Sequence, residues 1–277
     1  MPLSKLRLPR LPAGFQLVAL IVLTLLCLLA AGCIGDTDTP QNTLAPEGEV
    51  AETQRDLFML AMWPALVVMV LVLGAIVVTV LRFRRRPDDA IPKQTHGNMS
   101  LEVAWTIVPT LIIIIFVGIP MIPAIFELGD EPAADAFPVN VTGQRFNWFF
   151  EYPEILDAEG QPVQAARPGE LHIPAGREVA LTLRADDVIH SFGVPRLAGT
   201  RDAIPGEENT YWIKADHPGS FAGQCRELCG TGHADMLILV TALNEEDFEA
   251  WADEMAAGAK GSPDGGGDAV AASGSEE

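Results

Sequence analysis

The 277-residue chain has few basic side chains and few cysteines. From Gly129 onward, nine Lys and Arg stand against 27 Asp and Glu, whereas the residues before it hold nine against ten. Because nucleic-acid phosphates require basic patches, this deficit argues against a nucleic-acid partner. It favours a basic partner, or else serves solubility or adaptation to a salty medium. The four cysteines form no Cys-x-x-Cys-His motif, which excludes a covalently attached c-type haem.

Long uncharged runs are absent from the second half of the chain and crowd the first. Residues 57–81 are apolar and would span roughly 37 Å as a helix, enough for a bilayer core of about 30 Å. A second run covers residues 103–126, and its prolines are tolerable in a membrane helix. The loop between them, 82–102, holds five basic residues and is therefore predicted to face the cytoplasm. The sequence thus predicts a two-helix membrane hairpin with both ends of the mature chain outside.

The N-terminus predicts an export signal in residues 1–32. Basic residues precede a short apolar run that ends in small residues, which is the order found in secretory signals. The ending Ala-Gly-Cys resembles a bacterial lipoprotein cleavage site, and cleavage there would leave Cys33 as a lipidated N-terminus. Ordinary signal cleavage, or an uncleaved third span, is the alternative. Residues 33–56 are polar and are expected to form a linker.

Residues 130–244 predict an external all-β domain. Short alternating or β-prone runs lie near residues 137–142, 178–184, 210–213 and 236–241, with Pro-Gly turn signals between them. About 110 residues with this pattern suit a Greek-key sandwich. In this layout His190 and the loop 223–236 fall at the same end of the sandwich, where loops can hold a metal site. The acidic tail, 245–277, is expected to start with a surface helix and to end in a disordered segment.

The loop 223–236 reads GQCRELCGTGHADM and carries most of the candidate metal ligands. Together with the upstream imidazole, the donors are two thiols, two imidazoles and a thioether: Cys225, Cys229, His190, His233 and Met236. Soft sulfur with imidazole selects copper or zinc over magnesium or calcium. An exported cysteine pair can instead be a disulfide. Structural zinc has the right ligand count, although its cysteines usually lie closer in sequence. A mononuclear blue-copper site leaves one cysteine unexplained, so the donor set favours two bridged coppers.

Four motifs occur in order between about His96 and Val240. The metal loop is close to G-Q-C-S-E-x-C-G-x-x-H-x-x-M, residues 187–195 read DVIHSFGVP, residues 202–206 read DAIPG, and residues 102–109 read EVAWTIVP. Together they resemble subunit II of the haem–copper cytochrome c oxidases, which carries the dinuclear copper centre CuA. The resemblance implies a cupredoxin-like domain on the extracytoplasmic side of a bacterial plasma membrane.

The resemblance also implies roles for individual residues. Cys225 and Cys229 would bridge both coppers, His190 and His233 would each bind one, and Met236 would be an axial ligand. The backbone carbonyl of Glu227 would complete the other copper, and its carboxylate would reach a magnesium ion at the interface with subunit I. Without the resemblance, this carboxylate is simply a solvated loop residue. Glu102 would lie at the mouth of a proton pathway into subunit I; chemically it is equally suited to be a first-turn helix acid.

The chain departs from the family pattern at two places near the copper loop. The aromatic stretch G-H-Q-W-Y-W-x-Y-E-Y appears as GQRFNWFFEY over residues 143–152. Phe146 therefore replaces the tryptophan through which the family receives electrons, while Trp148 keeps the second tryptophan. Either Phe146 still covers the copper edge or the electrons arrive elsewhere. The second departure is Arg226, which stands where the family has serine and places a positive charge beside the loop.

The resemblance implies a terminal respiratory oxidase subunit. It would accept electrons from cytochrome c or a small copper protein at CuA and pass them to subunit I, where oxygen is reduced to water with proton translocation. Three alternatives remain: a quinol oxidase subunit II without copper, a nitrogen-oxide reductase subunit with the same copper domain, and a membrane-tethered copper chaperone. The intact ligand set argues against the first, and the two-helix hairpin argues against the last.

Overall fold

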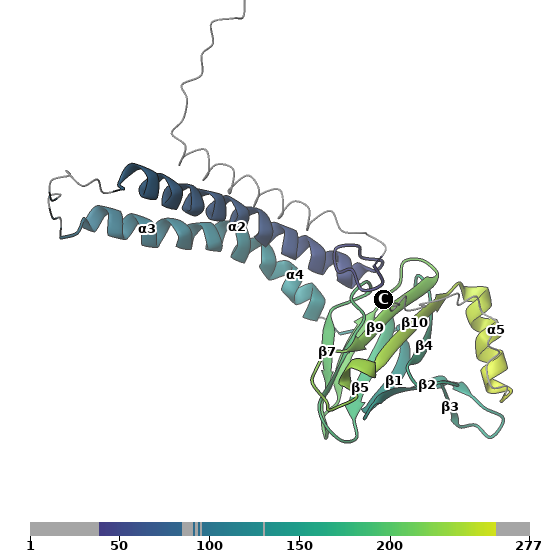
Figure 1. Cartoon of the computed structure of the whole chain (residues 1–277). Coiled ribbons are helices and arrows are strands. Elements are labelled where there is room, and N and C mark those ends of the chain that lie inside the picture. Colours follow the sequence, from purple (N-terminus) through teal and green to yellow (C-terminus); the bar gives the residue numbers. More distant parts are fainter. Residues whose placement is uncertain (1–38, 85–90, 92–93, 95, 130, 259–277) are drawn as a thin grey trace, which may run out of the picture. The chain divides into compact units, whose positions relative to one another are not determined.

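The computed structural model describes residues 39–84, 91, 94, 96–129 and 131–258 (Figure 1). The predicted signal peptide, Cys33 and the end of the tail beyond residue 258 lie outside the described residues. Packing divides the described chain into two units. One consists of residues 59–120 apart from the gaps above, and the other of residues 39–58 and 121–258. We describe each unit separately.

Two long helices confirm the predicted membrane hairpin. They are α2 (Glu49–Arg82) and the continuous helical stretch Met99–Gly129, and the most apolar windows of both are fully exposed on the protein. Figure 1 draws the two helices alongside each other with opposite chain directions. Leucine, isoleucine and valine in such numbers are stable outside a protein core only in lipid.

The bounds of the helices differ from those expected from hydropathy alone. Helix α2 begins at Glu49, inside the segment predicted as a linker, because Glu49 and Glu52 suit a helix N-terminus and Val50 is buried against the sandwich. The second stretch consists of α3 (Met99–Ile112), a π-helical turn η1 (Ile113–Gly118) and α4 (Ile119–Gly129). The π turn lies just before Pro120, which has no N–H to donate to the preceding turn.

The second unit is an all-β sandwich, as predicted. One sheet has the order β3-β2-β1-β5-β8 and the other β4-β10-β9-β6-β7. The strands of the first sheet are β1 (Phe137–Gln144), β2 (Asn147–Leu156), β3 (Pro162–Gln164), β5 (Val179–Ala185) and β8 (Asn209–Ile213). Those of the second are β4 (Glu170–Pro174), β6 (His190–Gly193), β7 (Thr200–Ala203), β9 (Gly219–Cys225) and β10 (Leu237–Leu243). Parallel pairing of β1 with β5 and of β10 with β4 accompanies the antiparallel pairs.

Alternating side chains build the core between the sheets. Along β2, Trp148, Phe150 and Tyr152 are buried, and the residues between them face outward. The helix α5 (Glu245–Ala256) follows β10, confirms the predicted surface helix, and packs through Phe248 and Trp251 near Phe137 and Tyr152. The core therefore fixes the second sheet, on whose end the candidate metal ligands lie.

Candidate metal centre

Two strands and one loop bring the candidate ligands together. His190 is the first residue of β6 and Cys225 the last of β9, and these strands pair with Phe192 opposite Cys225. The loop from β9 to β10 contains Cys229 and the short helix η2 (His233–Asp235). The backbone N–H of Cys225 donates to the carbonyl of Met236 at 2.9 Å, which closes this loop on itself.

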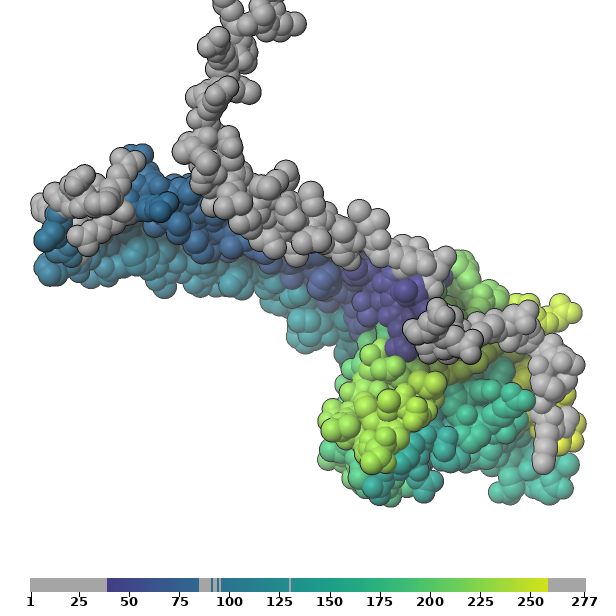
Figure 2. Space-filling model, in the orientation of Figure 1, coloured from purple at the N-terminus to yellow at the C-terminus, as the bar shows by residue number. Residues whose placement is uncertain are grey.

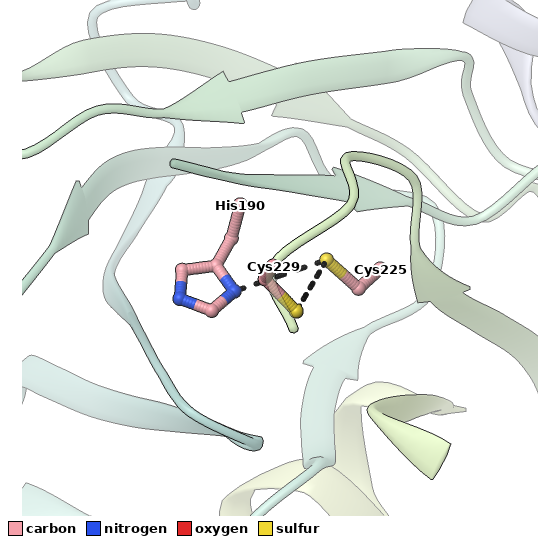
Figure 3. A group of neighbouring side chains, drawn as sticks. All are labelled: His190, Cys225 and Cys229. Carbon is pink, nitrogen blue, oxygen red and sulfur yellow. Dashed lines mark hydrogen bonds between the residues drawn. The ribbon is translucent and has the colours of Figure 1, made fainter. Parts of the chain in front are cut away.

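The five predicted side-chain donors form one cluster. Figure 3 shows His190, Cys225 and Cys229 pointing toward one another. Nδ1 of His190 lies 3.8 Å from Sγ of Cys225, and the two cysteine sulfurs are 4.0 Å apart. Sγ of Cys229 lies 3.7 Å from Nδ1 of His233 and 3.8 Å from Sδ of Met236. The five side chains therefore lie within contact distance of one another, and their role as metal ligands stays a prediction.

The backbone carbonyl of Glu227 also faces the cluster, 3.3 Å from Sγ of Cys225. The side chain of Glu227 is exposed, so only its main chain takes part in the cluster. His190 and Met236 are fully buried, whereas His233 is half-buried. The cluster thus offers two sulfurs at its centre with nitrogen, thioether and carbonyl donors around them.

Asp187 fixes how His190 presents its ring. Its Oδ1 lies 2.9 Å from Nε2 of His190, so Nε2 carries the proton and the Nδ1 lone pair points at the cluster. Burial acts to raise the pKa of the Asp187 carboxyl, but hydrogen bonds from the Arg145 backbone, His190, the Val188 backbone and the Arg145 side chain outweigh it. The pKa therefore falls well below its ordinary range, and the carboxylate stays charged.

The arrangement of the two thiols suits a shared metal better than a disulfide bond. Both are free, and at 4.0 Å their sulfurs are not bonded. Burial, followed by the charge of neighbouring Cys225, raises the pKa of the Cys229 thiol to about 11. Two buried thiolates side by side would repel, so a cation between them is the natural partner of the ionised pair. The donor set of two soft sulfurs, two imidazoles and a thioether is compatible with a copper site.

Two aromatic side chains adjoin the cluster. Trp148 is fully buried, and its ring meets that of His190 edge-on with centroids 5.9 Å apart. Phe146 is half-buried, and its ring packs against the ligand loop. The contact is close, since a Cβ added at Gly232 would lie 2.6 Å from the ring. The Phe146 ring therefore contacts the ligand loop, and its part in electron entry stays a prediction.

Glu102 belongs to the other unit and lies at the start of α3. Its Oε1 accepts a hydrogen bond from the backbone N–H of Asn98 at 3.2 Å, and the Asn98 side chain accepts from Leu101. Both contacts satisfy free N–H groups at the helix N-terminus. The described contacts thus give Glu102 a capping role, and its proton-path role stays a prediction.

Sequence reasoning missed residues that support the ligands without binding metal. Gly143 is one, because an added Cβ would lie 3.0 to 3.2 Å from three atoms of His190. Asp187 is another; its position in the motif before His190 was visible, but its contact with Nε2 was not. The spacing of cysteines and histidines indicates candidate ligands alone, because Gly143 belongs to β1 and the contact of Asp187 with His190 depends on how the chain folds.

Two family models match the chain. The transmembrane domain of cytochrome c oxidase subunit II matches residues 43–123, and the periplasmic domain of the same subunit matches residues 137–243. The sandwich is thus the extracytoplasmic part of a two-pass membrane protein.

The chain is also similar to curated relatives and to a solved structure. Cytochrome c oxidase subunit 2 of Alkalihalophilus pseudofirmus is 36% identical over 241 residues, which cover 85% of this chain and 67% of that protein. Quinol oxidase subunit 2 of Bacillus cereus is 30% identical over 249 residues, which cover 88% of this chain and 81% of that protein. The crystal structure of the periplasmic domain of subunit II of cytochrome oxidase from Bradyrhizobium japonicum is 30% identical, covers 46% of this chain and 96% of its own, and superimposes with a TM-score of 0.39. The chain belongs to the cytochrome c oxidase subunit II family.

Proposed function

We propose that this chain is the electron-accepting subunit of a terminal respiratory oxidase and that its buried cluster holds the dinuclear copper centre CuA. The convergence of five side-chain donors and one carbonyl on a single site carries the proposal. In this role the chain takes electrons from cytochrome c or a small copper protein. It delivers them to the haem–copper subunit I, where oxygen is reduced to water with proton translocation.

The ligand residues are suited to holding two coppers. Cys225 and Cys229 offer a pair of bridging sulfurs, His190 and His233 offer one nitrogen each, and Met236 offers a weak thioether. When bound, the dinuclear centre supplies one-electron transfer. The protein supplies rigidity, because His190 and Cys225 belong to paired strands and Asp187 fixes the imidazole. A quinol oxidase subunit would not need this donor set.

The charge of the C-terminal half of the chain suits a basic electron donor. The nine basic and 27 acidic residues from Gly129 onward give a net charge of 9 − 27 = −18 for that half of the chain. Such an excess attracts a basic protein over long range and speeds its association. Phe146 over the ligand loop and Trp148 against His190 provide short contacts from the surface to the ligands. We therefore assign the route of the electrons to the Phe146 side of the loop.

Two carboxylates, those of Glu227 and Glu102, have proposed roles toward subunit I. The Glu227 side chain is exposed while its carbonyl faces the cluster, so one residue can serve both a copper and a hard cation such as magnesium. Glu102 lies at the first turn of α3, where a carboxylate would be at the membrane surface. Its assignment to the mouth of a proton pathway rests on the resemblance and not on its contacts.

Copper loading of the full-length chain in detergent tests the proposal. We expect two coppers per chain, strong thiolate-to-copper absorption, and an EPR hyperfine pattern of one electron shared by two equivalent nuclei. His233→Gln should replace this pattern by that of an altered site, whereas His217→Gln, which removes an exposed histidine of the same domain, should preserve it. A signal of a single copper in the wild type, or no copper uptake by the reduced protein, would contradict the proposal.

A further inference from the structure

Residues 39–48, the segment just before α2, form a strap on the sandwich. Their main chain is held by hydrogen bonds from Glu47 to the Arg196 carbonyl at 2.7 Å and from Asp216 to the Glu47 carbonyl at 3.1 Å. The guanidinium of Arg196 donates in addition to the carbonyl of Ala45 at 3.0 Å. Figure 2 shows the purple atoms of this part of the chain against the green atoms of the sandwich. The strap is thus part of the folded domain.

One side chain of the strap reaches the copper loop. The amide of Gln41 accepts a hydrogen bond from Nη2 of Arg226 at 2.6 Å and donates one to Oε1 of Gln224 at 3.2 Å. Gln224 and Arg226 are the two residues that flank Cys225 in the chain. Gln41 is half-buried, so neither bond is fully open to competition from water. The side-chain amide of Gln41 therefore bonds to the side chains of both residues that flank the candidate ligand Cys225.

Arg226 also contacts strand β6, which carries the candidate ligand His190. Its backbone N–H donates to the carbonyl of Ser191 at 2.9 Å, directly after His190. Its aliphatic stem lies on the backbone of Gly193, where an added Cβ would come within 2.6 Å of Cγ. Among the salt bridges of the described residues none involves Arg226, so the amide of Gln41 is the polar partner of its guanidinium. The arginine that departs from the family serine thus bridges strand β6, the copper loop and the strap.

We propose that Gln41 is a positioning residue for Cys225, acting through Gln224 and Arg226. The role in copper binding rests on the proposed function, whereas the restraint on the loop does not. Gln41 precedes residue 43, where the first of the two family matches begins. The contacts of Gln41 therefore come from a part of the strap that lies outside both matches. Its two hydrogen bonds restrain the side chains on each side of a ligand thiol that is 1% exposed.

The first measurement needs no metal. Reduced, copper-free full-length protein is treated with a thiol-alkylating reagent, and the rate at Cys225 is followed by peptide mass spectrometry. Gln41→Ala should alkylate Cys225 about tenfold faster than wild type, because a charge-assisted and a neutral hydrogen bond no longer hold the loop shut. Arg226→Ser should give the same direction of change. Glu49→Gln is the matched control: it breaks the bond of Glu49 to Lys214 just beyond the strap, and should leave Cys225 as slow as in wild type.

The second measurement uses the copper-loaded protein. Gln41→Ala should lose copper to a chelator about tenfold faster and shift the copper absorption and hyperfine splitting, whereas Glu49→Gln should do neither. Equal alkylation rates in wild type and Gln41→Ala would overturn the inference, as would equal acceleration by Glu49→Gln. The proposed function fails separately, when the wild type itself shows no dinuclear copper signature; the alkylation rates then still decide the role of Gln41.

Discussion

Asp187 orients His190, which is the fully buried one of the two candidate imidazole ligands. It accepts from Nε2 of His190 at 2.9 Å and is itself held by Arg145, whose Nε lies 2.9 Å from Oδ2. We predict that Asp187→Ala weakens copper binding by about 10- to 100-fold, the usual cost of losing a partner that orients a metal-bound histidine. Competition for copper against a chelator of known affinity measures this loss.

The neighbouring Asp186 offers the control for this variant. It carries the same charge one residue earlier and is exposed, so Asp186→Ala changes the electrostatic field without touching His190. Copper affinity should therefore stay close to that of wild type. Equal losses in the two variants would mean that charge alone matters, and would contradict an orienting role for Asp187.

At the residue scale, the sequence predicts ligands better than their supports. Cys225, Cys229 and His233 lie within one loop, so their spacing points to them as candidate ligands, and His190 adds the upstream imidazole. Gly143 and Gln41 could not be found in this way, because their contacts with His190 and with the flanks of Cys225 come from segments distant in the chain. Such contacts follow from the tertiary fold, which spacing along the sequence does not encode.

At the scale of elements, α5 is attached to the sandwich by a histidine that burial keeps neutral. The ring of His172 in β4 stacks on Trp251 with centroids 4.8 Å apart and an interplanar angle of 15°. Burial lowers the pKa of His172, and the nearby Glu170 offsets part of this shift. Because the unfolded chain then binds the proton more readily, the folded state gains stability as pH rises through this window and loses it as pH falls below about 6.5.

This linkage predicts an acid-sensitive helix. Lowering the pH through the range just below 6.5 should loosen α5, seen as a change in Trp251 fluorescence and earlier urea unfolding of the sandwich. His172→Gln should flatten that part of the stability profile, because it removes the group that titrates differently in the two states. An unchanged profile in the variant would assign the pH dependence to other groups.

The elements differ in how well the sequence foretells them. Strands β1, β5 and β10 bury alternate residues, and this period made them predictable. Strand β6 is buried at all four positions and β7 is exposed at three of four, so neither shows a period of two. The start of α2 was missed for a related reason: hydropathy reports the membrane-spanning part, whereas its first turns are fixed by packing of Val50 on the sandwich.

At the scale of the whole molecule, copper would stabilise only one of the two units. All candidate ligands lie in the unit of residues 39–58 and 121–258, and none lies in the membrane helices. A ligand that binds the folded state stabilises it by about 4 kcal/mol when present at about a thousand times its dissociation constant. For a domain of this size, that corresponds to a rise of roughly 10–20 °C in the unfolding midpoint.

We therefore predict two separable thermal transitions in the full-length chain. Copper should raise the midpoint reported by near-ultraviolet circular dichroism, to which the buried Trp148 beside His190 contributes, and leave the far-ultraviolet helical signal of the membrane segments in place. Removal of copper by a chelator should reverse the rise. Cys229→Ser should abolish it, since the variant keeps the sandwich core but loses a bridging sulfur. If copper raised the midpoint of Cys229→Ser as much as that of wild type, the metal would be acting somewhere other than this cluster.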